Sequence, residues 1–108
     1  MPFEVFLTAD AARDLEELCH YIARHDASEK AEYVLAKIEK TFSSLSESPE
    51  RGSYPKELLA LGIRDYREIF FKPYRLIYRI IGNTVYVYLI VDGRRDMQTL
   101  LKRRLLES

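Results

Sequence analysis

Arginine side chains recur at strand spacing in the run YRLIYRII, residues 74–81. Two more arginines are adjacent in the basic segment Gly93-Arg94-Arg95-Asp96. Because side chains alternate between the two faces of a strand, Arg75 and Arg79 are expected on one face. Guanidinium groups bind phosphates and carboxylates through several N–H donors at once. This segment is therefore where an anionic partner is expected to dock.

A two-residue hairpin turn is predicted at Gly82-Asn83, between two runs of strand-forming residues. This turn sets Arg79 opposite Tyr86 and Ile77 opposite Tyr88. The face that results is predicted to be cationic and aromatic, and it carries Arg75, Arg79, Tyr86 and Tyr88.

The opposite face of the same hairpin is apolar enough to form the wall of a core. It is predicted to consist of Tyr74, Leu76, Tyr78, Ile80, Val85, Val87, Leu89 and Val91.

Two amphipathic helices are predicted before these strands, after a short strand at Phe3–Leu7. The first helix is expected to be capped by Thr8 or Asp10. The second is expected to begin with a capping box of Asp26 and Glu29. The apolar stripes of both helices follow helical spacing and comprise Leu15, Leu18, Cys19 and Ile22 in the first, and Ala31, Val34, Leu35, Ile38, Phe42 and Leu45 in the second.

A final helix is predicted from the spacing of Met97, Leu100, Leu101 and Leu105. The fold class is therefore α+β, in the order strand, two-helix hairpin, three-stranded antiparallel sheet and C-terminal helix. The length of 108 residues is typical of one domain, predicted at 1–108. The sequence leaves open whether the first strand joins the sheet.

The net charge of zero conceals a strong asymmetry along the chain. Residues 1–50 contain five basic and eleven acidic side chains, for a charge of −6, and residues 51–108 carry +6. The basic half contains the arginines described above. Local potential is thus expected to matter more than the overall charge.

Composition also suggests several absences. The single cysteine, Cys19, cannot form an internal disulfide, and Cys and His residues show no metal-ligand spacing. No cofactor and no metal are therefore predicted. The longest apolar run is too short to cross a bilayer and residues 1–10 lack the features of a signal peptide, so we expect no membrane contact and a cytoplasmic location.

Three segments together resemble the RelE/ParE family of type II toxin-antitoxin toxins. They are Tyr66-Arg67-Glu68-Ile69, Pro73-Tyr74-Arg75-Leu76-Ile77-Tyr78-Arg79 and Asp92-Gly93-Arg94-Arg95-Asp96. The resemblance covers nearly the whole chain and implies a plasmid stabilisation type toxin that causes growth arrest. It also implies a cognate antitoxin partner that neutralises the toxin, with operator DNA bound only through that antitoxin.

This family divides into two chemistries. ParE-like members poison DNA gyrase, whereas RelE-like members cleave mRNA on the ribosome. Cleavage requires a base, an acid and cations for the phosphate. RelE-like nucleases typically carry a tyrosine in the tail, where this chain has Leu101, and no Tyr or His follows Tyr88. These departures favour a gyrase inhibitor that is not an enzyme.

The nuclease nevertheless stays open as an alternative. Its catalytic residues would come from Arg75, Arg79, Glu68, Tyr86 and Asp92. Target-binding residues on the favoured hypothesis are Arg67, Arg75, Arg79, Tyr86, Tyr88, Arg94 and Arg95. An inactive binding module with the toxin fold is the third hypothesis.

Each of these residues also has a plain structural interpretation. Arg75 and Arg79 could form ion pairs with Asp65 or Glu68 on the protein surface. Tyr86 and Tyr88 could be packing residues of a half-buried sheet. The turn at Phe71-Lys72-Pro73 leaves the register of the preceding strand undetermined.

Overall fold

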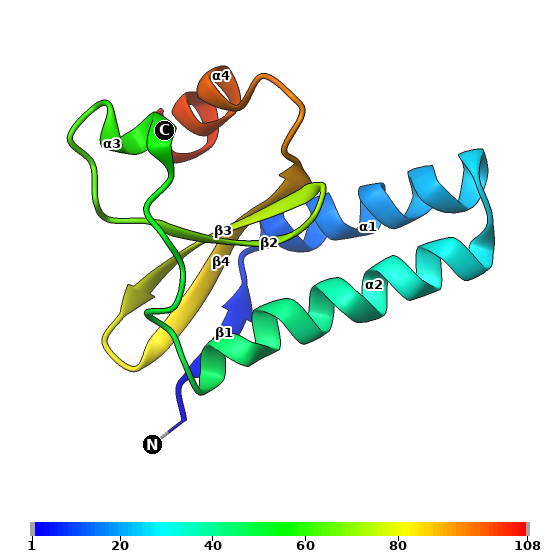
Figure 1. The fold of residues 1–108 in the computed structure, drawn as a ribbon, viewed down its shortest axis with the longest axis horizontal. Helices are drawn as coiled ribbons and strands as arrows, with labels where there is room; N and C mark the ends of the chain where they lie inside the picture. Colours follow the sequence, from blue (N-terminus) through cyan, green and yellow to red (C-terminus); the bar gives the residue numbers. More distant parts are fainter. Residues whose placement is uncertain (1, 108) are drawn as a thin grey trace.

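The computed structural model describes residues 2–107, so Met1 and Ser108, the two ends of the predicted domain, lie outside the described residues. The predicted elements occur in the predicted order, and two short helices that were not predicted, the 3-10 helix η1 (Ser44–Ser46) and α3 (Lys56–Leu59), lie between the second long helix and the next strand (Figure 1). The full order is β1 (Glu4–Leu7), α1 (Ala9–His25), α2 (Ser28–Ser43), η1, α3, β2 (Arg67–Phe71), β3 (Tyr74–Ile81), β4 (Thr84–Asp92), α4 (Met97–Leu101) and the π-helical turn η2 (Lys102–Leu106).

One four-stranded sheet forms the centre of the molecule, with strand order β1-β4-β3-β2. Strand β1 pairs in parallel with β4, and the other neighbours are antiparallel. The α+β prediction is confirmed, and the question of the first strand is settled because β1 forms an edge of the sheet. Glycine at 82 supplies the positive φ of 61° in the β3–β4 turn, which is the backbone that this hairpin turn requires.

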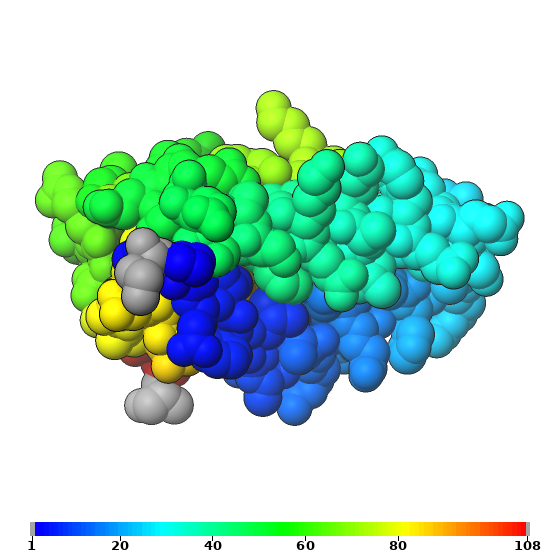
Figure 2. Space-filling view, turned by 90° about the horizontal axis from the view of Figure 1, so that it is seen from below, coloured from blue at the N-terminus to red at the C-terminus, as the bar shows by residue number. Residues whose placement is uncertain are grey.

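Helices cover both faces of the sheet. In Figure 1 the α1–α2 hairpin lies along one side of the strands, and α3 and α4 lie together on the other. Figure 2 shows the outer side of the hairpin, where α1 and α2 run side by side. Two apolar clusters fill the space between the sheet and the helices, one on each face of the sheet.

The prediction of one apolar and one exposed face was wrong for two reasons: residues of α3 and α4 pack on the face that was expected to be exposed, and a bulge in β4 moves Leu89 and Val91 onto that face. Tyr78 pairs with Val87, whereas Ile77 pairs with Leu89 and not with Tyr88. Tyr88 is thus an extra residue, and one extra residue moves every later side chain of the strand to the other face. Leu89 therefore packs in the cluster beneath α4, not against the α1–α2 hairpin.

The helix starts agree only in part with the predicted caps. The Thr8 hydroxyl accepts a hydrogen bond from the Ala11 amide and caps α1, as expected. The capping box of Asp26 and Glu29 was wrong, because Ala27 is the N-cap of α2 and makes no side-chain hydrogen bond. Asp26 instead ends α1 and forms an ion pair with Lys30.

A buried tyrosine fixes the irregular segment after α2. The Tyr78 hydroxyl donates to the Pro49 carbonyl at 2.6 Å and accepts from the Gly52 amide at 3.0 Å. A Cβ atom at position 52 would lie 2.5 Å from that hydroxyl and 2.6 Å from the Glu68 carbonyl oxygen. Glycine is therefore required where this segment crosses the edge of β2, and the segment in turn satisfies the hydroxyl of a fully buried tyrosine.

Candidate functional site

Arg75 lies inside the molecule, not on the predicted exposed surface. Only 8% of it is exposed. Its guanidinium donates to Glu57 through Nη1 and Nη2, both at 2.8 Å, and its Nε donates to Glu68 Oε1, also at 2.8 Å. The fork of Arg75 is thus fully engaged by two carboxylates, in the bidentate geometry that guanidinium groups favour.

Three separate segments build this ion-pair cluster. The register Phe70 to Arg75 and Glu68 to Ile77 puts Glu68 diagonally beside Arg75 on one face of the sheet. Helix α3 then brings Glu57 over the guanidinium. Gly93 leaves the space for the arginine stem, since a Cβ there would lie 2.7 Å from Arg75 Cδ.

The pKa values of the two carboxylates in this cluster are shifted in opposite directions. The hydrogen bonds from Arg75 hold the pKa of Glu57 below its ordinary value of 4.5. Burial is the largest influence on Glu68 and raises the pKa of that group above 4.5, although Arg75 opposes the shift. Glu68 is the more deeply buried of the two, since only 6% of it is exposed, so desolvation of the charged form outweighs the ion pair.

We therefore expect opposite pH dependences in two variants. Glu57 stabilises the fold above pH 4.5 and loses this contribution as pH falls through its lowered pKa, so the advantage of the wild type over Glu57→Gln shrinks below pH 4.5. Glu68 gains a proton in the folded state above pH 4.5, so the stability of the wild type relative to Glu68→Gln rises as pH falls from 7 toward 4.5. Urea unfolding of the three proteins at pH 7, 4.5 and 3 measures both slopes, and slopes of the same sign would contradict the assignment.

Arg79 remains at the surface. It faces Tyr86 across β3 and β4, as the hairpin register predicted. It also pairs with Asp65 at 3.5 Å and lies over the Tyr66 ring at 5.8 Å. Tyr86 in turn stacks on Phe6 of β1, with ring centroids 6.2 Å apart. An arginine and two aromatic rings therefore form a row across three strands.

Arg67 lies on the opposite face from Arg79, because it pairs with Tyr78. Its guanidinium donates to the carbonyls of Glu50 and Gly52 and lies 4.7 Å from the centre of the Tyr54 ring. In this structure Arg67 holds the segment after α2 against the edge of the sheet. Arg67 is thus separated from Arg79 by the sheet, whereas Arg75 shares the face of Arg79 but is buried.

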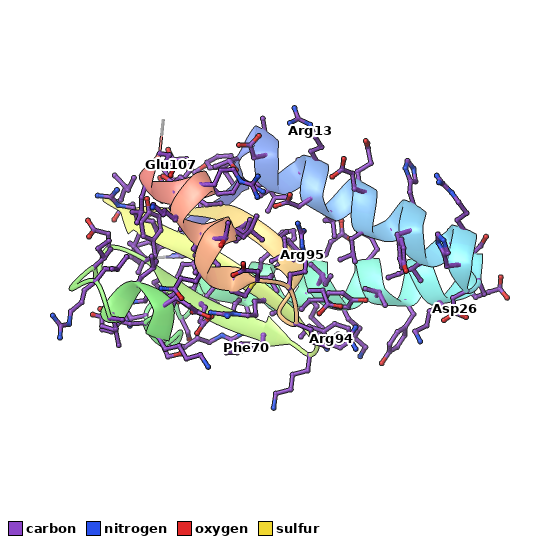
Figure 3. All side chains as sticks on the ribbon, turned by 90° about the horizontal axis from the view of Figure 1, so that it is seen from above. Arg13, Asp26, Phe70, Arg94, Arg95 and Glu107 are labelled. Atoms are coloured by element: carbon purple, nitrogen blue, oxygen red, sulfur yellow. The ribbon has the colours of Figure 1, made fainter. Side chains whose placement is uncertain are left out.

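The loop after β4 carries the most exposed of the predicted arginines. Arg94 forms an ion pair with Asp92, and the hydrogen bond from Arg94 lowers the pKa of the Asp92 carboxyl. Arg95 is exposed and forms no ion pair within residues 2–107. Figure 3 shows Arg94 and Arg95 together beside the C-terminal helical segment, facing the α1–α2 layer. Both line a hollow of about 500 Å³ between α1 and the end of β4.

Sequence reasoning missed one ion pair that joins the two ends of the chain. Arg104 of η2 donates to both Asp14 oxygens of α1, at 3.1 and 3.0 Å, and to the Tyr88 carbonyl at 3.0 Å. Asp14 also accepts from the Ile90 amide at 3.1 Å. These partners satisfy backbone groups on both sides of the bulge. No spacing rule connects residues 14 and 104, so no local pattern indicates this contact.

The candidate acid and base groups of a nuclease are dispersed or occupied. Glu68 is paired with Arg75, Asp92 with Arg94, and Tyr86 lies against Phe6. Leu101, at the position where the resemblance implies a tail tyrosine, is 1% exposed and packs in the cluster beneath α4. Among residues 2–107, no group of three or more His, Cys, Asp or Glu side chains is arranged to hold a metal ion.

The family model described as the ParE toxin of the type II toxin-antitoxin system parDE matches residues 5–97. The chain belongs to the ParE toxin family. A relative, the toxin ParE3 of Caulobacter vibrioides, is 27% identical over 100 residues, which are 93% of this chain and 96% of the relative. The order of strands and helices described above is thus that of a RelE/ParE family toxin.

Solved structures of toxins agree with this ParE-family fold. The chromosomal ParDE system of P. aeruginosa matches with a TM-score of 0.70 at 17% identity, over 83% of this chain and 95% of that one. The toxin-antitoxin complex RelBE2 of Mycobacterium tuberculosis gives 0.59 at 26% identity, over 85% and 92%. A free variant of E. coli toxin RelE gives 0.64 at 19% identity, over 97% and 100%.

These comparisons place this ParE-family chain among toxins of type II toxin-antitoxin systems. Within the described part of the chain, no helix is long and apolar enough to cross a membrane.

Proposed function

We propose that this ParE-family chain inhibits DNA gyrase, arrests growth when it is free, and is neutralised by a cognate antitoxin in a plasmid stabilisation type module. The observation that supports this most strongly is the burial of Leu101, where a ribosome-dependent nuclease of the wider family would carry its tail tyrosine. A core leucine supplies neither an acid nor a base.

The arrangement of the carboxylates supports the same proposal. A general base needs a free lone pair near the proton that it removes. Glu68 and Asp92 are instead held by Arg75 and Arg94. The groups that remain available at the surface are the cations and rings that serve binding, namely Arg79, Tyr86, Arg94 and Arg95.

The proposed antitoxin partner is supported by the similar solved structures. The ParDE and RelBE2 structures are toxin-antitoxin systems, and we infer that this chain is bound by an antitoxin, through which alone it reaches operator DNA. Its proposed place of action is the cytoplasm, where gyrase acts on DNA.

The experiment that tests the function is a supercoiling assay with purified gyrase, together with induced expression of the chain alone in a bacterial host. Inhibited supercoiling and DNA damage signalling with intact mRNA are expected. Cleaved mRNA with undamaged DNA would instead establish the nuclease, and harmless expression would establish the inactive binding module.

A matched pair of variants locates the surface that acts on gyrase. Arg95→Ala is expected to weaken inhibition several-fold, because it removes an exposed cation from the loop after β4. Arg24→Ala removes an exposed arginine from the far end of α1 and is expected to leave inhibition unchanged. Equal inhibition by wild type and Arg95→Ala would contradict a role for this loop.

A further inference from the structure

The outer side of the α1–α2 hairpin, which Figure 2 shows, carries an apolar groove between the two helices. Two adjoining hollows of about 330 and 240 Å³ share Cys19, His20 and Leu35, so they form one continuous groove. The groove begins at Leu7 of β1 and reaches Ala23 near the end of α1. We call this surface, from Leu7 to Ala23 along both helices, the hairpin groove. Its length along α1 is about 16 Å, which matches a helix of about three turns.

One end of the hairpin groove opens onto an edge of the sheet. The amides of Glu4 and Thr8 donate to carbonyls of the β3–β4 hairpin at 3.2 and 2.9 Å. Because the residues of a strand alternate in the direction of their backbone groups, those of Val5 and Leu7 point away from the sheet. Strand β1 is an edge strand, so no other strand within residues 2–107 pairs with these groups. Leu7 thus offers a backbone donor and acceptor at the edge while its side chain lines the groove.

The other edge of the sheet already has a partner. The Ser53 amide donates to the Glu68 carbonyl at 3.2 Å, and the Glu68 amide donates to the Ser53 carbonyl at 2.7 Å. By the same alternation, Phe70 is the next residue of β2 with outward backbone groups. A single residue is too short a segment for a strand to pair with. An added strand is therefore expected at β1.

The charge of the hairpin groove favours a basic partner. The carboxylates of its lining are those of Glu16 on α1 and Glu32 on α2, and both residues are exposed. Within residues 2–107, no lysine or arginine lines the groove. An apolar floor with a carboxylate on each helix fits an amphipathic helix that has basic residues beside its apolar stripe. The same carboxylates repel a nucleic acid.

An open strand edge that continues into an apolar groove fits one flexible protein segment. Pairing with a sheet edge and packing of a helix in a groove are two common modes of peptide recognition. Segments that fold on binding can combine both and wrap a large surface. The similar ParDE and RelBE2 structures are toxin-antitoxin systems, so an antitoxin is the partner that this surface fits best. Arg95, proposed above to act on gyrase, lines a different hollow on the other side of α1.

We propose that a segment of the cognate antitoxin pairs with β1 as an added strand and packs a basic amphipathic helix into the hairpin groove. This inference rests on the proposed function, because it gives the antitoxin named there a place on the toxin. The antitoxin and gyrase then contact different residues, so mutation separates the two interactions.

Exposed alanines allow the groove to be blocked without disturbing the core. Ala12→Gln and Ala23→Gln put a longer side chain into the groove at exposed positions of α1, where glutamine is a good helix former. The control is Ala60→Gln, at the exposed end of α3 on the other side of the sheet. The probe is the purified protein encoded beside this chain in the same operon. Calorimetry is expected to show its Kd raised about tenfold or more by each groove variant, and unchanged by Ala60→Gln.

Adjacent glutamates test the contribution of charge. Glu16→Lys reverses a carboxylate of the groove. Glu17→Lys makes the same change in net charge one residue away, where α1 lines the other hollow. Glu16→Lys is expected to weaken binding of the probe several-fold, and Glu17→Lys much less. Equal effects would show that the net charge of the chain is responsible, and would contradict the predicted basic face of the helix.

Hydrogen exchange tests the added strand. The amides of Val5 and Leu7 are expected to exchange more slowly in the complex than in the free toxin, because carbonyls of the partner strand accept from them. The Phe70 amide, which faces outward from β2, is the control and is expected to keep its rate. Figure 3 labels Phe70 at the far edge of the sheet. Protection of Phe70 in place of Val5 and Leu7 would overturn the assignment of the edge.

The outcomes distinguish this inference from the proposed gyrase target. Each variant is assayed alone for inhibition of gyrase supercoiling, and thermal melting confirms that it is folded. A wild-type chain that does not inhibit gyrase overturns the proposed target. Tight binding of the probe by both Ala12→Gln and Ala23→Gln, or an equal loss in Ala60→Gln, overturns the hairpin groove alone. A wild-type chain that the probe does not bind overturns the proposed neutralisation, and the groove with it.

Two further results would assign the groove to another occupant. Loss of gyrase inhibition in a folded groove variant would assign it to gyrase. A dimer of the free chain that Ala12→Gln dissociates, measured by analytical ultracentrifugation, would assign it to a second copy of the toxin. Either result overturns the inference.

Discussion

Arg75→Ala is expected to lower the free energy of unfolding by about 3–5 kcal/mol, the range for removing one partner of a buried ion pair. Arg75 is 8% exposed, and its guanidinium pairs with both Glu57 and Glu68. Its removal leaves two carboxylates facing each other in a poorly solvated site. Urea unfolding followed by circular dichroism measures the loss.

Arg95→Ala is the matched control for this variant. It removes the same side chain from an exposed loop and is expected to change stability by less than about 0.5 kcal/mol. If Arg75→Ala were as stable as Arg95→Ala, the buried cluster would not be a structural element. A loss of toxicity in Arg75→Ala consequently reports on folding, and cannot by itself assign Arg75 to the target-binding surface.

Asp14→Ala is expected to cost about 2–3 kcal/mol, near the upper end for hydrogen bonds to charged groups. Asp14 is mostly buried, receives two hydrogen bonds from Arg104 and also accepts from the Ile90 amide. Its removal leaves that amide and the guanidinium without their shared partner. The C-terminal helical segment is expected to loosen first, which hydrogen exchange measures as faster exchange of amides in residues 97–106.

Asp10→Ala supplies the control for Asp14→Ala. Asp10 lies one turn earlier on α1, is exposed, and approaches Arg104 only to 3.9 Å. Exposed ion pairs contribute little, so this variant is expected to stay within about 0.5 kcal/mol of the wild type. Equal losses in the two variants would show that the charge of α1, and not the specific contact of Asp14, is responsible.

The errors in the predicted strand register share one physical origin. The hairpin turn at Gly82 correctly predicted that Arg79 faces Tyr86, since register next to a two-residue turn follows from local geometry. Beyond Ile77 the predicted pairing of β3 with β4 was wrong, although Leu76 and Tyr74 lie on the predicted apolar face. A bulge costs a strand one pairing, and the partners that offset this cost, Asp14 and Arg104, come from the two ends of the chain.

The burial of the arginines also depends on contacts between distant parts of the chain. Their spacing correctly placed Arg75 and Arg79 on one face of β3, yet Arg75 is buried and Arg79 is partly exposed. The difference lies in what covers that face. Helix α3 brings Glu57 over Arg75 but does not reach Arg79, and this depends on how an irregular segment of the chain packs.

The sequence by itself determined the class of the fold, the order of its elements, the turn that aligns β3 with β4 and the family of the protein, because these depend on periodicity, turn chemistry and ordered motifs. Only the tertiary structure decided which cations are free, where the strand bulges, and which edge of the sheet lies open beside the hairpin groove. These features arise from contacts between residues far apart in the chain, and the burial of each group depends on all the elements that pack around it.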